Sequence, residues 1–193
     1  MLKILTPFLC LCFLLLSCGE NEAEQDENED PFGLNQWTTI GRSQLLIPDK
    51  IKPYYSSISL NGKYDFKHEE MELFIGIDEF RPSEIERFKT YHSFIRDVSY
   101  DDFTLNMALK LREMALFESR ISEKETVRSK YNYKLKTAII EGKEYLHSKL
   151  LSYVNITVEV GNLTYLIQFA CDQKNLRFYY QKMLDIAASI KTR

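Results

Sequence analysis

The fold is decided by the stretch KLKTAIIEGKEYLHSKLLSYVNITVEVGNLTYLIQFAC, residues 134–171, where runs of alternating side chains are separated by two short turn signals. The sharper signal is Gly161-Asn162, because glycine at the first central position suits a type II′ hairpin turn. A two-residue turn fixes the register of the strands that it joins. One face of this ribbon should be apolar, with the facing pairs Val160 and Leu163, Val158 and Tyr165, Ile156 and Ile167, and Val154 and Phe169.

The second turn signal is Glu141-Gly142, which predicts a strand at 133–140 before it and a long strand at 143–160 after it. In this register Lys136 faces His147 and Lys134 faces Lys149 on the outward, wetter face of the sheet. The result is a basic, aromatic strip made of Lys134, Lys136, Tyr145, His147, Lys149 and Tyr153. We expect it either to bind an acidic partner, a polysaccharide or a headgroup, or to be an ordinary solvated sheet face.

Further strands are predicted upstream of the ribbon. Alternating apolar residues indicate strands at 36–48, 64–68 and 71–80. A loop or short strand is expected at 50–59, and Asn61-Gly62 is a hairpin signal.

Helices are predicted where apolar residues recur every three to four positions. One runs over 103–121 with Asp101 or Asp102 as its cap, and another ends the chain over 176–190 with Asp172 or Asn175 as its cap. The stripe of the second helix should pack on the sheet. Residues 84–94 suggest a short helix or an irregular excursion, and 123–132 a charged linker.

The N-terminus has the features of a secretion signal. Lys3 precedes an apolar run over 4–16, which is too short to span a bilayer comfortably. The run ends in Leu15-Leu16-Ser17-Cys18, which resembles the lipobox of bacterial lipoproteins. This resemblance implies that residues 1–17 are a signal peptide, removed before an acylated Cys18 that anchors the chain in a membrane. An ordinary signal peptide or an N-terminal anchor helix is the alternative.

Charge is distributed unevenly along the chain, whose formal net charge is -3. Seven acids and no base lie within residues 20–30, so we expect an acidic, flexible tether over 18–31. From Pro31 onward 24 bases face 21 acids, and this small, mixed excess argues against nucleic acid as the main partner. Residues 32–193 are enough for a single domain with its own core.

Catalytic and metal-binding motifs are absent from the sequence. The three histidines, His68, His92 and His147, lie far apart, and no Cys-x-x-Cys pair, P-loop or nucleophile elbow is present. Cys171 is the single thiol left in the mature chain, and we expect it to be a small buried hydrophobe. We therefore predict no catalytic residue, no metal and no cofactor, although two acids distant in sequence can still converge.

The order of these elements resembles the PsbP-like fold, shared by an extrinsic subunit of photosystem II, a nuclear-import factor that binds the Ran GTPase, and many small bacterial lipoproteins. The matching features are the strand end at Leu45-Leu46-Ile47-Pro48, the hairpin within 64–80, the helix led by Asp102-Phe103, the Glu141-Gly142-Lys143 turn, and the last strand with its helix. The resemblance implies an α+β domain, an antiparallel β-sheet with helices packed on it. It also implies a non-enzymatic binding or assembly role.

The function expected from these observations is that of a lipid-anchored accessory or binding protein of the cell envelope, with an envelope protein as its partner. The alternatives are an envelope hydrolase with a dispersed carboxylate site and a carrier of a small ligand or lipid. Acids following the lipidated cysteine resemble export signals to the outer face of the outer membrane. We expect surface exposure there, with the periplasmic side as the alternative.

Overall fold

The computed structural model describes residues 30–55, 58–60, 62–91, 102–144 and 149–193. The contacts of the chain divide it into Met1–Pro31 and Phe32–Arg193, and the fold described here is that of the second unit. The signal peptide, Cys18 and nearly all of the acidic segment predicted above lie outside the described residues.

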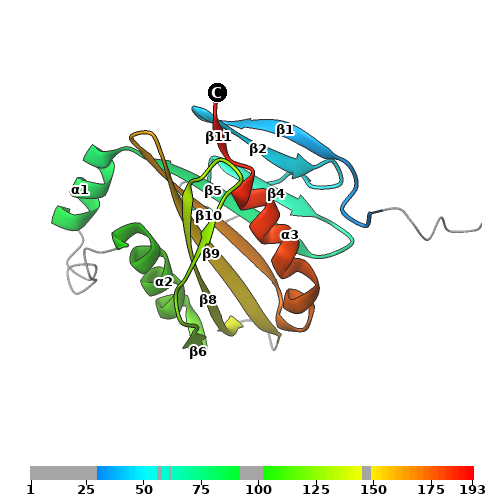
Figure 1. The fold of residues 1–193 in the computed structure, drawn as a ribbon. Coiled ribbons are helices and arrows are strands. Elements are labelled where there is room, and N and C mark those ends of the chain that lie inside the picture. Colours follow the sequence, from blue (N-terminus) through cyan, green and yellow to red (C-terminus); the bar gives the residue numbers. More distant parts are fainter. Residues whose placement is uncertain (1–29, 56–57, 61, 92–101, 145–148) are drawn as a thin grey trace, which may run out of the picture. The chain divides into compact units, whose positions relative to one another are not determined.

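An antiparallel sheet of eight strands forms the centre of Phe32–Arg193 (Figure 1). Along the sheet the strands are β3 (Lys52–Pro53), β4 (Tyr64–His68), β5 (Leu73–Phe80), β10 (Leu163–Asp172), β9 (Leu150–Val160), β8 (Lys134–Glu144) and β6 (Leu116–Ile121). The eighth strand, β7 (Glu125–Arg128), also pairs with β8. The antiparallel α+β prediction is thereby confirmed.

The predicted register of the β9–β10 hairpin is confirmed at all four pairs. Val160 lies opposite Leu163, and the pairing continues through to Val154 opposite Phe169. Gly161 has a φ of +64°, the positive value that the first central position of a type II′ turn requires. The local turn chemistry therefore sets the register of the central strands.

The predicted turn at Glu141-Gly142 is wrong, because β8 continues through both residues to Glu144. Gly142 lies within the strand, opposite Leu151. A Cβ atom on Gly142 would lie 2.9 Å from the Cβ of Leu116 and 3.1 Å from the carbonyl oxygen of Phe117. The absence of a side chain at Gly142 therefore allows β6 to lie close to β8, and the residue does not form a turn.

A second, three-stranded sheet contains β1 (Asn35–Ile40), β2 (Ser43–Pro48) and β11 (Lys191–Thr192). The single strand predicted at 36–48 is in fact a hairpin that turns at Gly41-Arg42. Gly41 has a φ of +57°, and the amide of Arg42 donates to Glu79 at 2.9 Å. The hairpin is held to the main sheet at its turn.

Within the described residues three α-helices accompany the sheets: α1 (Pro82–Tyr91), α2 (Phe103–Ala115) and α3 (Leu176–Ala188), the last preceded by a 3₁₀ turn η2 (Gln173–Asn175). The helix predicted over 103–121 ends six residues earlier, at Ala115. Phe117 and Ile121 have helical spacing, yet they belong to β6, which pairs with β8. The supposed linker 123–132 likewise contains β7, so pairing with β8 overrides the local pattern in both cases.

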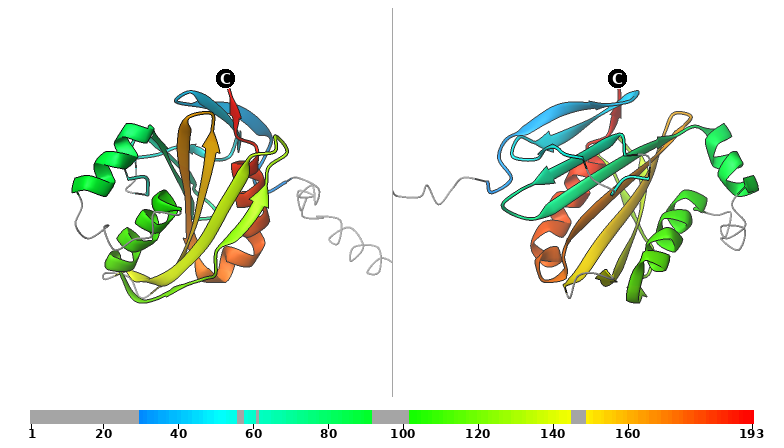
Figure 2. Two further views of the ribbon diagram at one scale, coloured as in Figure 1. Left: turned by 60° about the vertical axis from the view of Figure 1, so that its left-hand side comes forward. Right: turned by 180° about the vertical axis from the view of Figure 1, so that it is seen from behind.

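Both faces of the main sheet are covered, by α2 on one side and α3 on the other (Figure 2). Val154, Ile156 and Phe169 pack with Met183 and Ile186 of α3, as the apolar stripe of that helix predicts. The opposite face is not the wetter surface expected from the sequence, because α2 residues pack over it. Two of its polar residues contact each other in the interior: Nε2 of Gln168 donates to Oδ1 of Asn155 at 2.8 Å.

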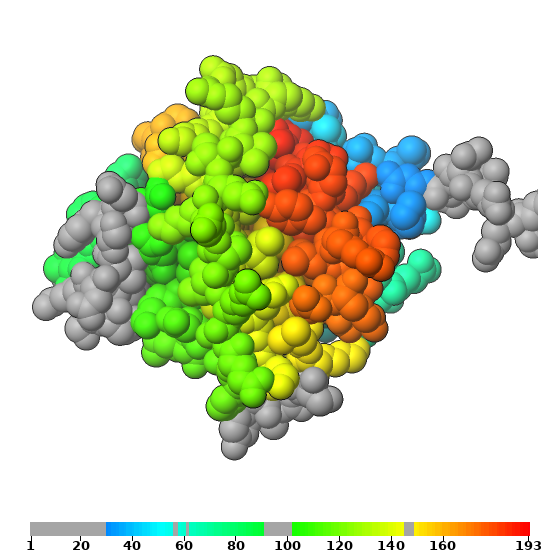
Figure 3. All heavy atoms as spheres, turned by 60° about the horizontal axis from the view of Figure 1, so that its bottom comes forward, coloured from blue at the N-terminus to red at the C-terminus, as the bar shows by residue number. Residues whose placement is uncertain are grey.

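Neither edge of the main sheet is a long, regular strand. At one edge β3 has two residues, the second being Pro53. At the other edge the register of β6 shifts between Phe117 and Arg120, and Glu118 has a φ of +53°. In the space-filling view the green β6–β7 segment crosses the surface beside the orange and red α3 (Figure 3).

Candidate functional site

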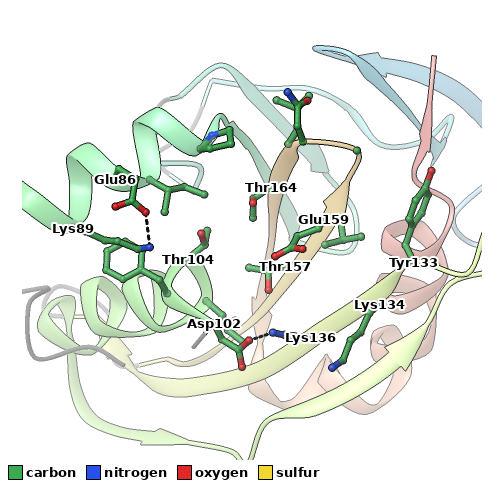
Figure 4. Close-up of a pocket in the computed structure, with 18 of the residues that line it drawn as sticks. Glu86, Lys89, Asp102, Thr104, Tyr133, Lys134, Lys136, Thr157, Glu159 and Thr164 are labelled. Carbon is green, nitrogen blue, oxygen red and sulfur yellow. Dashed lines mark hydrogen bonds and ion pairs between the residues drawn. The ribbon is translucent and has the colours of Figure 1, made fainter. Parts of the chain in front are cut away.

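A cavity of about 790 Å³ is a groove with walls from four parts of the chain (Figure 4). We call it the α1–α2 groove. Its polar and charged lining residues come from α1, the start of α2, the start of β8 and the β9–β10 hairpin: Glu86, Lys89, Asp102, Thr104, Asn132, Tyr133, Lys134, Lys136, Thr157, Glu159, Asn162 and Thr164.

An apolar cluster behind the groove holds its two helices against the sheet. The ring of Phe88 in α1 meets that of Phe80 in β5 at 5.9 Å, edge to face. Phe103 and Met107 of α2 join the same cluster, together with Leu166 of β10. Because these apolar side chains point into the cluster, the polar residues at the ends of α1 and α2 are left to line the groove.

Asp102 lies at the start of α2 but does not cap it as predicted. Its φ is +61°, and its side chain makes no capping hydrogen bond. The carboxylate instead forms an ion pair with Lys136 of β8, and Lys124 lies 4.0 Å away. Asp101, the other predicted cap, lies outside the described residues. Asp102 therefore ties the helix start to the sheet at the floor of the groove.

Threonine hydroxyls line the middle of the groove. Thr157 lies opposite Lys136 in the sheet, and Thr164 lies opposite Glu159. The side chains of Thr104 and Thr157 face the groove in Figure 4, and these residues are only 6% and 7% exposed. The floor of the groove therefore consists of closely packed side chains, among which the two threonine hydroxyls can form hydrogen bonds.

The charges around this floor are mixed. Lys89 pairs with Glu86 at 2.7 Å, and Lys136 pairs with Asp102. Lys134 and Glu159 are exposed, and neither has an ion-pair partner among the described residues. The groove can therefore donate and accept hydrogen bonds and can offer one lysine and one carboxylate to a ligand.

The four described members of the predicted basic, aromatic strip, Lys134, Lys136, Lys149 and Tyr153, do not form one surface. Lys136 faces Thr157 instead of His147, because the turn does not fall at Gly142. Lys134 and Lys136 line the groove, whereas Lys149 pairs with Glu72 at 3.2 Å. Tyr145 and His147 lie outside the described residues.

Tyr153, the last member of the predicted strip, is buried at 1% exposure. The guanidinium of Arg112 lies 4.6 Å from the centre of its ring, and its hydroxyl donates to Glu144. Burial, reinforced by that hydrogen bond, raises the pKa of Tyr153 well above its usual value. It packs under α2 and offers no ring to a partner.

The remaining candidate side chains are also buried. Cys171 is 2% exposed, as predicted, and burial raises the pKa of its thiol to about 12. His68 is buried beside Phe32, and its Nδ1 accepts the amide of Met71 at 3.4 Å. In the part of the chain that the structure describes, no cluster of three or more histidine, cysteine or acidic residues has the arrangement of a metal site.

Sequence reasoning missed Thr104, Thr157 and Glu159. The alternation that makes one face of β9 apolar places Thr157 and Glu159 together on the other face, and this was the available signal. Thr104 precedes Thr157 by 53 residues and Lys136 precedes it by 21, so the groove brings together distant segments that no local pattern indicates.

Comparison with known protein families and with curated proteins finds no match. Solved structures do match: the chain has the PsbP-like fold. It is similar to cyanobacterial PsbP (CyanoP) from Synechocystis sp. PCC 6803, with a TM-score of 0.56 and 9% identity, over 83% of this chain and 94% of that one.

Two further structures show the same architecture. The Ran-binding protein Mog1p of Saccharomyces cerevisiae matches with a TM-score of 0.51 and 8% identity, over 83% of this chain and 96% of that one. A protein of Bacteroides thetaiotaomicron matches with a TM-score of 0.51 and 10% identity, over 83% of this chain and 48% of that one. At these identities the likeness establishes the fold.

None of the helices within 30–55, 58–60, 62–91, 102–144 and 149–193 has both the length and the apolar character needed to cross a membrane.

Proposed function

We propose that this chain is a lipid-anchored binding or accessory protein of the cell envelope, which binds a protein partner in the α1–α2 groove. The observation that carries the proposal is the lining of the groove. Buried hydroxyls at Thr104 and Thr157 lie beside the unpaired charges of Lys134 and Glu159. This combination suits the mixed polar surface of a protein, whose backbone and side chains both donate and accept hydrogen bonds.

The proposed lipid anchor is supported by the sequence of the N-terminal segment. Leu15-Leu16-Ser17-Cys18 follows a short apolar run with one preceding lysine, and acids follow within a few residues. Acylation of Cys18 with two or more chains would hold the protein stably on a membrane. We place it on the outer membrane facing outward, with the periplasmic side as the alternative.

Binding is favoured over the two alternatives by the groove itself. Of its three carboxylates, those of Glu86 and Asp102 are already engaged by lysines, which leaves Glu159 without a second free acid for carboxylate chemistry. A lipid carrier needs an apolar cavity, whereas this lining is mostly polar. The similar protein Mog1p is described as Ran-binding, which supports a protein partner for this fold.

The anchor is tested by labelling cells with a radioactive or clickable palmitate. The wild-type chain should incorporate label and partition with the membrane fraction, while the Cys18→Ala variant should do neither. Label retained in the Cys18→Ala variant would contradict acylation at this cysteine.

The groove is tested by placing a photo-crosslinking amino acid at Glu159 and, as a control, at Lys174, which is also exposed but lies outside the groove. Crosslinking on intact cells should capture one stoichiometric envelope protein from position 159 only. A Thr157→Arg variant, which fills the floor, should abolish that product. Equal capture at both positions would refute the assignment of the groove.

A further inference from the structure

A cluster of aromatic and basic side chains lies on the small sheet, away from the groove floor. We call it the Trp37 patch; it consists of Trp37, Lys130, Tyr131, Lys182 and Lys191. The ammonium of Lys191 lies 3.5 Å from the centre of the Trp37 ring, and that of Lys130 lies 5.6 Å from it. Lys130 also lies 5.1 Å from the centre of the Tyr131 ring.

Four separate parts of the chain build the Trp37 patch, one of them α3, which contributes Lys182. Trp37 belongs to β1, Lys130 and Tyr131 to the turn between β7 and β8, and Lys191 to β11. In Figure 3 the lime-coloured β7–β8 turn lies beside the red end of the chain and the blue β1–β2 hairpin. Trp37 and Tyr131 are 42% and 39% exposed, so both rings remain accessible.

A hollow of about 390 Å³ has Lys130, the lysine that contacts both rings, in its wall. Lys130 and Lys182 both line it, and Asp185 is the acidic residue in its wall. Lysines therefore outnumber acids in the wall of this hollow. A hollow with two lysines in its wall has the size and charge to take a phosphate-bearing headgroup.

The Trp37 patch also lies near the point where the N-terminal segment joins the domain. The ammonium of Lys182 lies 5.2 Å from the centre of the ring of Phe32, the first residue of the folded unit. The chain from Cys18 to Phe32 spans at most roughly 50 Å when fully extended. A lipid attached to Cys18 would therefore keep this entry point within roughly 50 Å of the membrane surface.

We propose that the Trp37 patch docks on an anionic lipid bilayer and so fixes which way the domain faces. The proposal rests on the lipid anchoring given under the proposed function. Tryptophan and tyrosine favour the interface between water and lipid, where their rings are buried while their polar ends stay hydrated. Lysines near the surface are attracted to anionic headgroups.

The test uses the chain from residue 18 with Cys18→Ala, so that no acyl chain contributes to binding. All residues of the described core lie in Phe32–Arg193, which this chain retains. It is mixed with vesicles of phosphatidylcholine, with or without phosphatidylglycerol. Because Trp37 is the only tryptophan, its emission reports the Trp37 patch directly, and cosedimentation measures binding independently.

Vesicles with phosphatidylglycerol should shift the Trp37 emission to shorter wavelength and sediment the protein, and salt should weaken both effects. The triple variant Lys130→Gln, Lys182→Gln and Lys191→Gln should bind about fivefold more weakly for each lysine removed. The control changes Lys110, Lys143 and Lys174 to Gln, which alters the net charge equally at sites paired with Glu113, Glu118 and Asp172.

Absence of binding to anionic vesicles, or equal losses in both triple variants, would overturn the proposal. Binding that appears only after residues 20–30 are deleted would also overturn it, because the acidic segment would then be the occupant of the Trp37 patch. Since the assayed chain carries no lipid, these failures leave the palmitate-labelling result at Cys18 unaffected, and the two proposals fail separately.

Discussion

Replacing Gly76 with alanine tests how the loop before β4 packs on the sheet. A Cβ atom on Gly76 would lie 2.3 Å from the amide nitrogen of Ser59 and 2.7 Å from the carbonyl carbon of Ile58. Both are backbone atoms, so the loop itself has to move. The amides of Ser59 and Leu60 donate to the buried carboxylates of Asp65 and Asp78 at 3.1 and 2.8 Å, and the movement strains these bonds.

The expected cost follows from these contacts. Overpacking costs about 1–3 kcal/mol. Loss of one hydrogen bond to a charged acceptor costs about 1.5–3 kcal/mol. Alanine also restricts the unfolded chain more than glycine does, which adds about 0.4–1 kcal/mol to the free energy of unfolding. Gly76→Ala should therefore lower the free energy of unfolding by roughly 2–5 kcal/mol, or the melting temperature by about 4–20 °C.

The assay is urea unfolding followed by Trp37 fluorescence and by circular dichroism. Gly62→Asn is the matched control, because Gly62 has a φ of +64°, which asparagine tolerates, and a Cβ there meets nothing within 4 Å. The control should stay within about 0.5 kcal/mol of the wild type. A Gly76→Ala variant no less stable than this control would refute the packing of Ser59 on Gly76.

Three further outcomes are expected. Gly142→Val should destabilise by about 1–3 kcal/mol in the same unfolding assay, because its Cβ meets Leu116 and Phe117, whereas little change would favour a turn at this residue. Phe169→Ala, at a fully buried ring, should cost about 3–5 kcal/mol, and a loss under 1 kcal/mol would contradict its place in the core. Burial raises the pKa of Cys171 to about 12, so above about pH 9 the unfolded thiol loses its proton while the folded thiol keeps it. The free energy of unfolding should therefore fall as pH rises from about 9 to 12. The urea concentration at the unfolding midpoint should fall less steeply with pH in the Cys171→Ala variant than in the wild type. Equal slopes in the two proteins would contradict the raised pKa of Cys171.

The central hairpin was predictable because its information is local. Gly161-Asn162 sets the turn, and the turn sets every pair from Val160–Leu163 to Val154–Phe169. Residue spacing also located α3, and α1 matches the first of the two alternatives given for residues 84–94, a short helix. In these segments the preference of the sequence agrees with the final packing, so no longer-range information was needed.

The wrong predictions concern segments whose structure is determined by contacts with residues far away in the sequence. Gly142 has the sequence signature of a turn, yet its role is to admit Leu116 from 26 positions earlier. Phe117 and Ile121 continue a helical pattern, but hydrogen bonds to β8 make them a strand. The missed turn at Gly41-Arg42 is different, since the glycine was visible in the sequence and the apolar residues around it obscured the break.

The groove was predictable only in part, for the same reason. Lys134 and Lys136 were recognised as surface features, but the shifted turn gave them the wrong neighbours. Their actual surroundings, Asp102, Thr104 and Thr157, come from α2 and β9 and meet only once the whole sheet has formed.

The blunted edges of the main sheet have a consequence for a protein held on a membrane. Anchoring confines molecules to a plane, which raises the rate at which their sheet edges meet. A long, flat edge strand under such crowding would invite pairing between copies and growth of a fibre. The two-residue β3 with Pro53, and the bulged β6 with Glu118 at a positive φ, leave no regular row of backbone groups for another copy to extend. Under the lipid anchoring proposed above, both edges would therefore keep neighbouring copies separate at high surface density.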